Sequence, residues 1–142
     1  MIDANLFAIL RQEIHSADEQ REQTILASRE IIHLSKQIIY ALHRDQNVTA
    51  LLAVIEQRVR SLPSLVNSHH SVACQEYVEA VTYAAFVAEQ PLPSSTDLKV
   101  RAEDYVAGLC DLSGELVRKA VSVATKGDVV FVQRIFNFVS VL

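Results

Sequence analysis

The sequence contains few residues that interrupt helices. Its 142 residues include three glycines, three prolines and no tryptophan, and neither glycine nor proline occurs between Ile2 and Leu42. No internal repeat is present, and no alternation of apolar and polar residues predicts a β-strand before residue 128. These absences disfavour a fold built on a sheet. We therefore expect an all-α protein, an antiparallel helical bundle with a long N-terminal helix.

Several function classes are also disfavoured by what the chain lacks. No run approaches the roughly 20 apolar residues that a membrane span needs, and the N-terminus has no uninterrupted apolar segment typical of a signal peptide. The net charge of −4 offers no general attraction for nucleic acid, so such binding needs a local basic patch. Cys74 and Cys110 form no CxxC motif, and we expect both to be reduced, buried core residues of an intracellular protein.

The helical spacing of apolar residues divides the chain into segments. About 40 residues at the N-terminus predict one or two long helices, and a continuous helix would span about 60 Å at ~1.5 Å per residue. A helix of that length usually lies along a bundle or an oligomer interface. Thr49 is a candidate cap for the second helix, Pro63 ends it, and Gly127 closes the fourth. The predicted helices cover residues 2–42, 49–60, 67–89 and 102–125, with a loop at 90–98.

The last 14 residues, VVFVQRIFNFVSVL, are mostly apolar, and their pattern does not distinguish a helix from a strand. An apolar end of this kind is typical of a shortened chain or of a segment that a partner covers. In the second case the tail and the long first helix would together contact another chain.

Two glutamates stand out in the third predicted helix. Glu76 and Glu79 lie one turn apart in CQEYVEAVTYAAF, which is otherwise almost entirely apolar or small. On a helical wheel their face also carries Tyr83 and Phe86, and a helix that is apolar on nearly all sides is an interior helix. No lysine or arginine lies within residues 61–98 to neutralise the pair. Two partly buried like charges are costly unless a cation joins them or one takes a proton.

The fourth predicted helix carries a second stripe of acids. Asp104, Asp111 and Glu115 share one face of this helix, and Gly108 and Gly114 flank them. Each glycine lowers helix stability, on the order of 1 kcal/mol relative to alanine, so we expect a closely packed neighbour beside it. A close neighbour would let the acids of two helices converge.

Each stripe also has a simpler explanation. A pair of helical acids is far more often a solvated face than a metal site. Arg118 and Lys119 follow Glu115 by three and four residues, so either could pair with it on the helix surface. Two stripes on otherwise apolar helices leave both explanations open.

Other catalytic motifs are absent or incomplete. Glu30 and His33 form one ExxH, whereas carboxylate di-iron bundles need two such motifs and two further glutamates, so an ordinary histidine is favoured. His69 and His70 lack zinc-ligand spacing, and no P-loop, GxSxG or GxGxxG is present. Only the carboxylates remain as catalytic candidates.

Three segments carry a resemblance to a known family: SREIIHLSKQIIYALHR (28–44), QEYVEAV (75–81) and EDYVAGLCDLSGELVRKAVSVATKGD (103–128). They resemble the translin family, and within it the catalytic branch of translin-associated factor X. The similarity runs from about Phe7 to Asp128. It implies an all-helical, translin-like fold whose members assemble into hollow octamers. It also implies a metal-dependent endoribonuclease, made with translin, that removes the passenger strand during RNA interference and processes transfer-RNA fragments.

The family's motifs carry its site residues onto this chain. EYVEA places the catalytic glutamates on Glu76 and Glu79, and DLSGE places the catalytic aspartate on Asp111 and a neighbouring acid on Glu115. The non-catalytic translin branch lacks acids at the first pair, so their presence here favours the catalytic type. The resemblance implies that these four carboxylates bind Mg²⁺ or Mn²⁺, cations that prefer oxygen ligands.

The chain departs from the family in two places. Family members continue past Gly127 and Asp128 for two further helices that contribute to folding and assembly, whereas this sequence ends at Leu142. Before the glutamate helix they carry basic residues that face RNA, and here only His69 and His70 are available as RNA-binding candidates. We expect a single translin-like helical domain that lacks the C-terminal helices of the family.

The sequence therefore predicts an endoribonuclease subunit that cleaves single-stranded RNA with a metal-activated water. Its expected partners are translin or a second copy of itself, with DNA as another ligand and no membrane, and its expected location is the cytoplasm and the nucleus. The alternative is a non-catalytic helical subunit that binds translin or itself through the first helix and the apolar tail. The two predictions differ in their response to metal. The nuclease needs a divalent metal for activity, whereas a divalent metal would affect the interaction subunit only through its stability.

Overall fold

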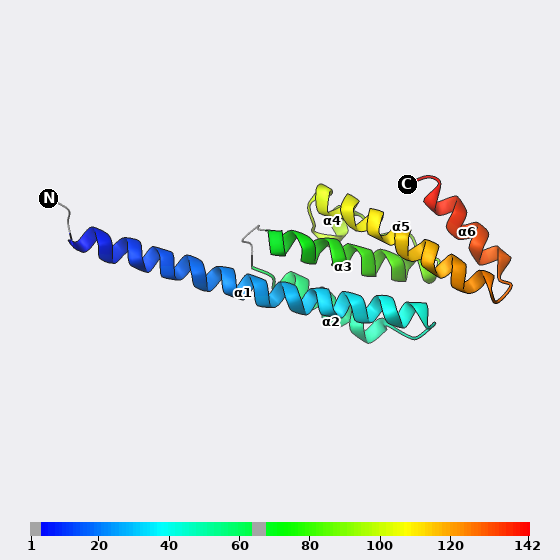
Figure 1. Ribbon diagram of the computed structural model, residues 1–142, viewed down its shortest axis with the longest axis horizontal. Coiled ribbons are helices and arrows are strands. Elements are labelled where there is room, and N and C mark those ends of the chain that lie inside the picture. Colours follow the sequence, from blue (N-terminus) through cyan, green and yellow to red (C-terminus); the bar gives the residue numbers. More distant parts are fainter. Residues whose placement is uncertain (1–3, 64–67) are drawn as a thin grey trace.

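Six helices make up the part of the chain that the structure describes. The computed structural model describes residues 4–63 and 68–142, and no strand occurs within these ranges (Figure 1). The all-α prediction is therefore confirmed. The helices are α1 (Ala4–His43), α2 (Thr49–Arg60), α3 (Ser68–Val87), α4 (Ser95–Leu98), α5 (Ala102–Ala124) and α6 (Val129–Val139).

Helix α1 is continuous over 40 residues, in keeping with its lack of glycine and proline. Its two halves have different surroundings (Figure 1). Residues 5–23 project from the body and are all exposed, whereas the second half packs against α2 and α3. Ile31, Ile38 and Leu42 are buried along one face of the packed half, because residues spaced by seven and four positions align on a helix. The apolar pattern therefore decides where the helix joins the body.

Helix α3 lies between α1 and α5 at the centre of the bundle. Its opposite sides are both buried, with Tyr77 and Val78 on one side and Ala80 and Tyr83 on the other. The interior position predicted from its composition is confirmed. Its two glutamates consequently lie on a helix that has neighbours on both sides.

The three central helices α1, α3 and α5 run in the same direction (Figure 1). Lys36 contacts Glu76 and His43 contacts Tyr83, and both pairs are 40 positions apart, so α1 and α3 keep a constant register. The antiparallel arrangement that we expect holds for the consecutive pairs α1–α2 and α5–α6. Helix α2 and the segment 88–101 return the chain between the parallel helices. This register sets the acids of α3 beside the end of α1.

Two local predictions are corrected by the structure. Val48, rather than Thr49, is the N-cap of α2, because Thr49 already has helical geometry as the first residue of the helix. The segment 90–98, predicted as a loop, contains the short helix α4. Ser94 and Asp97 form a capping box at its start, in which each side chain accepts a hydrogen bond from the other residue's backbone N–H.

The two glycines of α5 have different surroundings. A Cβ at position 108 would lie 2.7 Å from the carbonyl oxygen of Gln75 and from the Val78 side chain, so α5 approaches α3 more closely than a larger residue allows. Nothing lies within 4 Å of a Cβ added at Gly114, so the packing prediction for that glycine is wrong. Gly108 alone marks the close approach of the two helices.

The two cysteines are free and differ in exposure. Cys74 is buried in α3, as predicted, but Cys110 is exposed, so its prediction as a core residue is wrong. Cys110 lies two positions after the buried Gly108, about 200° around the helix axis, and therefore points away from α3.

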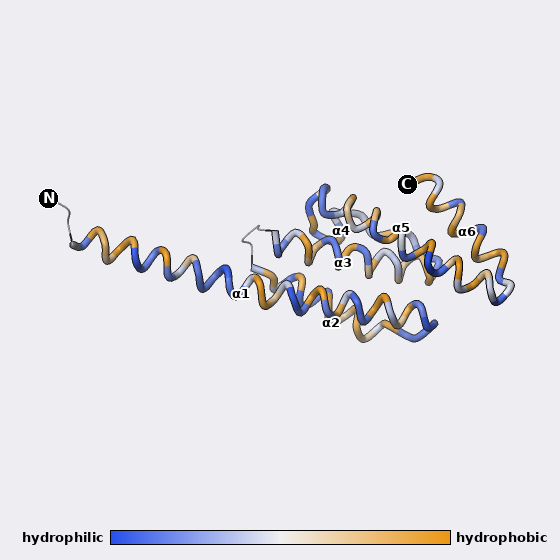
Figure 2. Tube along the Cα trace, in the orientation of Figure 1, coloured by the Kyte–Doolittle hydropathy of each residue, from blue (hydrophilic) through white to orange (hydrophobic). Residues whose placement is uncertain are grey.

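The apolar tail forms α6, so the ambiguity between helix and strand is resolved. The Asp128 side chain accepts a hydrogen bond from the Phe131 N–H, 3.0 Å away, and caps the helix. Ile135 is buried, and Phe131 and Phe138 pack against Phe86 of α3. Hydrophobic residues nevertheless run along much of α6 (Figure 2), and those that remain exposed are Val129, Val130 and Phe136. None of the described helices has the length and apolar character needed to cross a membrane.

Candidate active site

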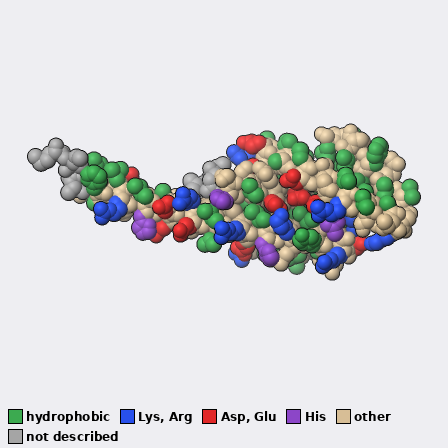
Figure 3. Space-filling view, viewed as in Figure 1, with side chains coloured by type: hydrophobic (Ala, Val, Ile, Leu, Met, Phe, Trp, Pro, Cys, Tyr) green, Lys and Arg blue, Asp and Glu red, His purple; other side chains and the backbone are tan. Residues whose placement is uncertain are grey.

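Helices α1, α3 and α5 form a cavity of about 230 Å³ whose lining carries three carboxylates and two cations. Figure 3 shows acidic and basic side chains grouped on one face of the body. The parallel register of α1 and α3 and the close approach at Gly108 bring these side chains together. The lining residues are Lys36, Ile39 and Tyr40 from α1, Glu76 and Glu79 from α3, and Glu115 and Arg118 from α5.

Glu79 is the most buried of the carboxylates, with 7% of the residue exposed. Burial raises the pKa of its carboxyl to about 7, and the charges of Glu76, Asp111 and Glu115 add to the rise, while Lys36 opposes it. Its carboxylate makes no hydrogen bond or ion pair with the described residues. The cavity therefore contains one buried carboxyl group that has no direct partner among the described residues.

Glu76 is neutralised from a neighbouring helix. The Nζ atom of Lys36 lies 3.2 Å and 3.4 Å from the two carboxylate oxygens of Glu76. No lysine or arginine occurs within 61–98, and the structure supplies the neutralising cation from α1. The contact spans 40 positions, so only the packing of α1 on α3 creates it.

Glu115 is held by two side chains. One of its oxygens, Oε2, lies 2.6 Å from His43 Nε2, and the other, Oε1, lies 3.2 Å from a guanidinium nitrogen of Arg118. The other ring nitrogen of His43, Nδ1, lies 3.4 Å from the Tyr83 hydroxyl, and the two rings pack edge to face. These contacts fix the orientation of the Glu115 carboxylate at the cavity wall.

Only one of the two cations that could pair with Glu115 does so. Arg118 forms the pair, whereas Lys119 is 2% exposed and donates to Asp45 and to the carbonyl oxygen of Leu42. Lys119 thereby ties the C-terminal end of α1 to α5. This tie holds the last turn of α1, including His43, beside the cavity.

Asp111 lies one turn before Glu115 on α5 and is exposed. It does not line the cavity, but its charge is among those that raise the pKa of Glu79. The structure thus brings Glu76, Glu79 and Glu115 around one cavity and leaves Asp111 outside its lining.

The four carboxylates have the chemistry that a divalent cation requires, but their conformations do not form a metal site. Within residues 4–63 and 68–142, no group of three or more His, Cys, Asp or Glu side chains is placed to hold an ion. Glu76 and Glu115 point toward Lys36, His43 and Arg118 instead. Oxygen donors around an uncompensated Glu79 fit Mg²⁺ or Mn²⁺, provided that the ion pairs open.

The other candidates from the sequence lie apart from the cavity. His69 is exposed at the start of α3, and His70 is partly buried, with Nδ1 3.6 Å from the Cys74 sulfur. Burial lowers the pKa of His70, with further effects from Asp104 and Arg101. Neither histidine lines the cavity, so the structure adds nothing to their prediction as RNA-binding residues.

The remaining acids have ordinary partners. Glu30 pairs with Arg58, and His33 contacts Gln37 on the same exposed face of α1, as expected of a solvated ExxH. Asp104 was grouped with Asp111 and Glu115 on the sequence, but it is bound to Arg101 and Ser71 at the beginning of α5. The acids of α5 therefore lie in different surroundings, with Asp104 at the beginning of the helix and Glu115 at the cavity.

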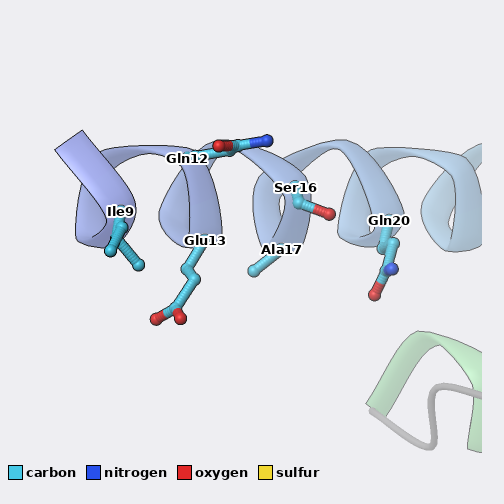
Figure 4. A pocket seen from close by; sticks show the side chains of 6 residues that line it. All are labelled: Ile9, Gln12, Glu13, Ser16, Ala17 and Gln20. Atoms are coloured by element: carbon cyan, nitrogen blue, oxygen red, sulfur yellow. The ribbon is translucent and has the colours of Figure 1, made fainter.

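A second hollow, on the projecting half of α1, does not form an enclosed site. Figure 4 shows its six side chains arising from one stretch of α1, the helix that supplies all of its lining residues. A surface of this kind can contact another molecule but does not by itself position groups for catalysis. Its residues are Ile9, Gln12, Glu13, Ser16, Ala17 and Gln20.

Two residues that line the cavity, Lys36 and Tyr40, and His43, which contacts the lining residue Glu115, were not singled out from the sequence. Lys36, Tyr40 and His43 follow one another at intervals of four and three, so they lie on one face of α1. This spacing was a usable signal, because polar or aromatic residues recur at one helical face beside the apolar face of Ile31 and Ile38. Their relation to Glu76 and Glu115 depends on tertiary contacts across 40 and 72 positions.

Comparisons with known proteins agree with this arrangement of helices. Residues 19–142 match the Translin family. Translin-associated protein X homolog of Schizosaccharomyces pombe is 30% identical over 84% of this chain and 62% of its own length. Translin-associated protein X of Rattus norvegicus is 24% identical over 87% of this chain and 60% of its length. An uncharacterized protein of Methanocaldococcus jannaschii is 28% identical over 85% of this chain and 59% of its own length.

The fold also matches a solved structure titled "Crystal structure of apo-NeC3PO". The TM-score is 0.74 at 25% sequence identity, and the match covers 95% of this chain and 76% of that one. The curated relatives extend further, because this chain spans about 60% of their length.

Proposed function

The chain belongs to the translin family, and on that premise we propose that it is a nuclease subunit that cleaves single-stranded RNA at the cavity between α1, α3 and α5. The names of its relatives support a subunit that works with translin, and a second copy of this chain is the other candidate partner. This chain spans about 60% of the length of those relatives, so its activity, its substrate and its partner are all part of what we propose.

The observation that carries the proposal is the environment of Glu79. A buried carboxylate without a hydrogen bond or direct ion pair lowers stability, and three further acids around it increase the cost. Perturbed carboxyl groups that face a cavity are typical of functional sites. A role in binding a cation would explain why three acids line one cavity, with Asp111 near enough for its charge to act on Glu79.

Glu76, Glu79, Asp111 and Glu115 are the residues that would hold Mg²⁺ or Mn²⁺. Bound there, the cation would supply an activated water and stabilise the negative charge that develops on the scissile phosphate. Glu79 has to be ionised to contribute, and its raised pKa makes this step depend on pH near neutrality.

The cations of the cavity have a separate role in the proposal. Lys36 and Arg118 are about half to two-thirds exposed and pair with Glu76 and Glu115. If these glutamates turned toward a bound cation, Lys36 and Arg118 would be free to bind phosphates of the RNA backbone. His43 keeps its contact with Glu115 Oε2 and orients that carboxylate, with the Tyr83 hydroxyl behind the ring.

A cleavage assay tests the proposal. Single-stranded RNA labelled at its 5′ end is incubated with the chain alone and with translin, in Mn²⁺ or in EDTA. We expect metal-dependent cleavage with 5′-phosphate and 3′-hydroxyl products, lost in Asp111→Asn and retained in the control Asp18→Asn on the projecting half of α1. Products ending in a 2′,3′-cyclic phosphate, or full activity of Asp111→Asn, would contradict the assignment.

A non-catalytic interaction subunit is the second candidate function. It is favoured by the exposed apolar side chains of the projecting half of α1, such as Phe7 and Ile14, and by those of α6. It predicts no RNA cleavage in any mixture and no change in melting temperature on adding Mn²⁺. A complex with translin that forms without either response would favour this function over the nuclease.

A further inference from the structure

Tyr40 is a cavity-lining aromatic residue that the carboxylate chemistry does not use. It lines the cavity from α1 and is nevertheless 60% exposed. Its hydroxyl makes no hydrogen bond to the residues that the structure describes, and its ring packs on no other described ring. The ring is therefore available to a molecule that enters the cavity.

The neighbours of Tyr40 are cations. Lys36 lies one turn earlier on α1, and Arg118 reaches the same cavity from α5, with side chains 55% and 67% exposed. Proteins bind single-stranded nucleic acid by combining cations that follow the backbone with aromatic rings on which bases stack. The two cations and the aromatic ring all line this cavity.

Other exposed aromatic residues lack this setting. Phe136 is 66% exposed, but the groove beside it is lined by apolar side chains and Ser140, without lysine or arginine. Phe7 is exposed on the projecting half of α1 and does not line the hollow found there. Tyr77 lines a cavity that contains cations, but it is only 4% exposed. Within the described residues, the combination of an exposed ring, a cavity and two cations occurs at Tyr40.

We propose that Tyr40 is a base-stacking residue, on which one base of single-stranded RNA lies while Lys36 and Arg118 bind adjoining phosphates. The inference rests on the proposed nuclease function and adds a substrate-positioning residue to it. Stacking on a ring is tolerant of sequence because every base has an aromatic face. Tyr40 therefore positions the strand beside the carboxylates without selecting a particular base.

The absence of tryptophan from the chain provides a direct probe. Tyr40→Trp introduces a single indole at the cavity, and Phe136→Trp introduces a matched one on α6. Each variant is titrated with oligouridylate in Ca²⁺ to suppress turnover, and binding is followed in parallel by the anisotropy of a fluorescein-labelled strand. We expect quenching of the Tyr40→Trp fluorescence, and none for Phe136→Trp or with an abasic strand of the same length.

Removal of the ring provides the second measurement. Tyr40→Ala should weaken binding of oligouridylate by about 5- to 100-fold, the usual contribution of one stacked base, and Tyr40→Phe should bind like the native chain. The effect on the abasic strand should be small. Because the side chain is largely exposed, the melting temperature of Tyr40→Ala should stay close to that of the native chain.

Two results would overturn the inference in different ways. If RNA binds and is cleaved, but Tyr40→Ala binds as tightly and Tyr40→Trp is quenched no more than Phe136→Trp, the stacking role is wrong and the proposed function survives. If the native chain, alone and with translin, binds no labelled strand, the proposed function fails and the stacking role fails with it.

Discussion

Two buried carboxylates in the contact region of α3 and α5 have very different partners, although both are buried. Asp104 is 1% exposed at the start of α5, and Glu79 is 7% exposed in the middle of α3. Burial alone would raise the pKa of Asp104, but hydrogen bonds from Arg101, Ser71 and Gln75 hold it below its ordinary value. Glu79 has no such donors, and burial together with three neighbouring acids raises its pKa to about 7.

The comparison shows that the partners of a buried charge, more than its burial, separate a structural group from a functional candidate. Asp104 of α5 accepts hydrogen bonds from Ser71 of α3 and from Arg101, the N-cap residue of α5, so it joins the two helices in the folded chain. Glu79 faces a cavity whose other acids repel it, so its present environment favours the protonated form. Asp104 is thus stabilised by its partners, whereas the ionised form of Glu79 is destabilised by its surroundings.

The largest expected effect is a stability change that depends on pH. The folded chain keeps the Glu79 proton up to about pH 7, and the unfolded chain loses it near the ordinary value of 4.5. The free energy of unfolding therefore falls as the pH rises through this window, because the folded state binds more protons there. Glu79→Gln should be more stable than the native chain by about 3 kcal/mol at pH 8, and equally stable below pH 4.5.

Urea denaturation in EDTA at pH 4.5, 6 and 8 measures this difference for Glu79→Gln. The control is Glu22→Gln, an exposed acid on the projecting half of α1, which should follow the native chain at every pH. A Glu79→Gln variant that is less stable than the native chain at pH 8 would remove the argument that this carboxylate is unsatisfied.

The second-largest expected effect is the loss of stability when the Asp104 carboxylate is removed. Asp104→Ala removes the acceptor shared by Arg101, Ser71 and Gln75, and should lower the free energy of unfolding by about 2 kcal/mol. The partly exposed guanidinium of Arg101 can regain water, which keeps the loss below that of a fully buried pair. Asp111→Ala, an exposed acid on the same helix, should change stability by less than about 0.5 kcal/mol. Equal losses in the two variants would mean that partners do not distinguish these acids.

A third effect concerns the support of Glu115. His43→Leu removes the contact with Glu115 Oε2 and should weaken Mn²⁺ binding by about 10-fold, as expected when the partner of a metal ligand is lost. His43→Gln retains a donor and should restore much of the affinity. Mn²⁺ titration followed by electron paramagnetic resonance measures both variants without any cleavage assay. Identical Mn²⁺ affinities of the native chain and His43→Leu would show that Glu115 needs no positioning.

The smallest expected effect is on stability at Lys36. Lys36 forms an ion pair with Glu76, and the lysine side chain is about half exposed. Lys36→Gln should therefore lower the free energy of unfolding by less than about 1 kcal/mol. Binding of RNA should lose more, because one phosphate contact disappears and the dependence of the binding constant on salt becomes less steep. Unchanged salt dependence in Lys36→Gln would indicate that this cation serves only Glu76.

Much of the fold could be predicted from the sequence because it depends on local patterns. The long α1, the interior position of α3 and the end of α5 before Gly127 follow from helical periodicity and from the few glycines and prolines. The boundary at Val48 and the short α4 were missed because their signals extend over only a few residues. Gly108 and Gly114 looked alike in the sequence, and only the approach of α3 distinguishes them.

The candidate site was predicted in part. Glu76, Glu79, Asp111 and Glu115 were identified from their unusual surroundings and from the family motifs, and their catalytic role stays a prediction. Asp104 was grouped with them because a helical wheel records direction and not position along the helix. Lys36 and His43 were absent from the prediction, because a single helix gives no sign of which face meets an acid 40 or 72 positions away.

The sequence by itself determined that the chain is helical, which helix is interior, and that the glutamates of α3 have no counter-charge on their own helix. These properties depend on the spacing of residues within a few turns, and spacing is readable along the chain. Only the tertiary structure decided that α1, α3 and α5 run parallel, that Lys36 and His43 reach Glu76 and Glu115, and that Asp104 is satisfied while Glu79 is not. The reason is physical, because the energy of a buried charge is set by the groups around it in space, whatever their distance along the chain.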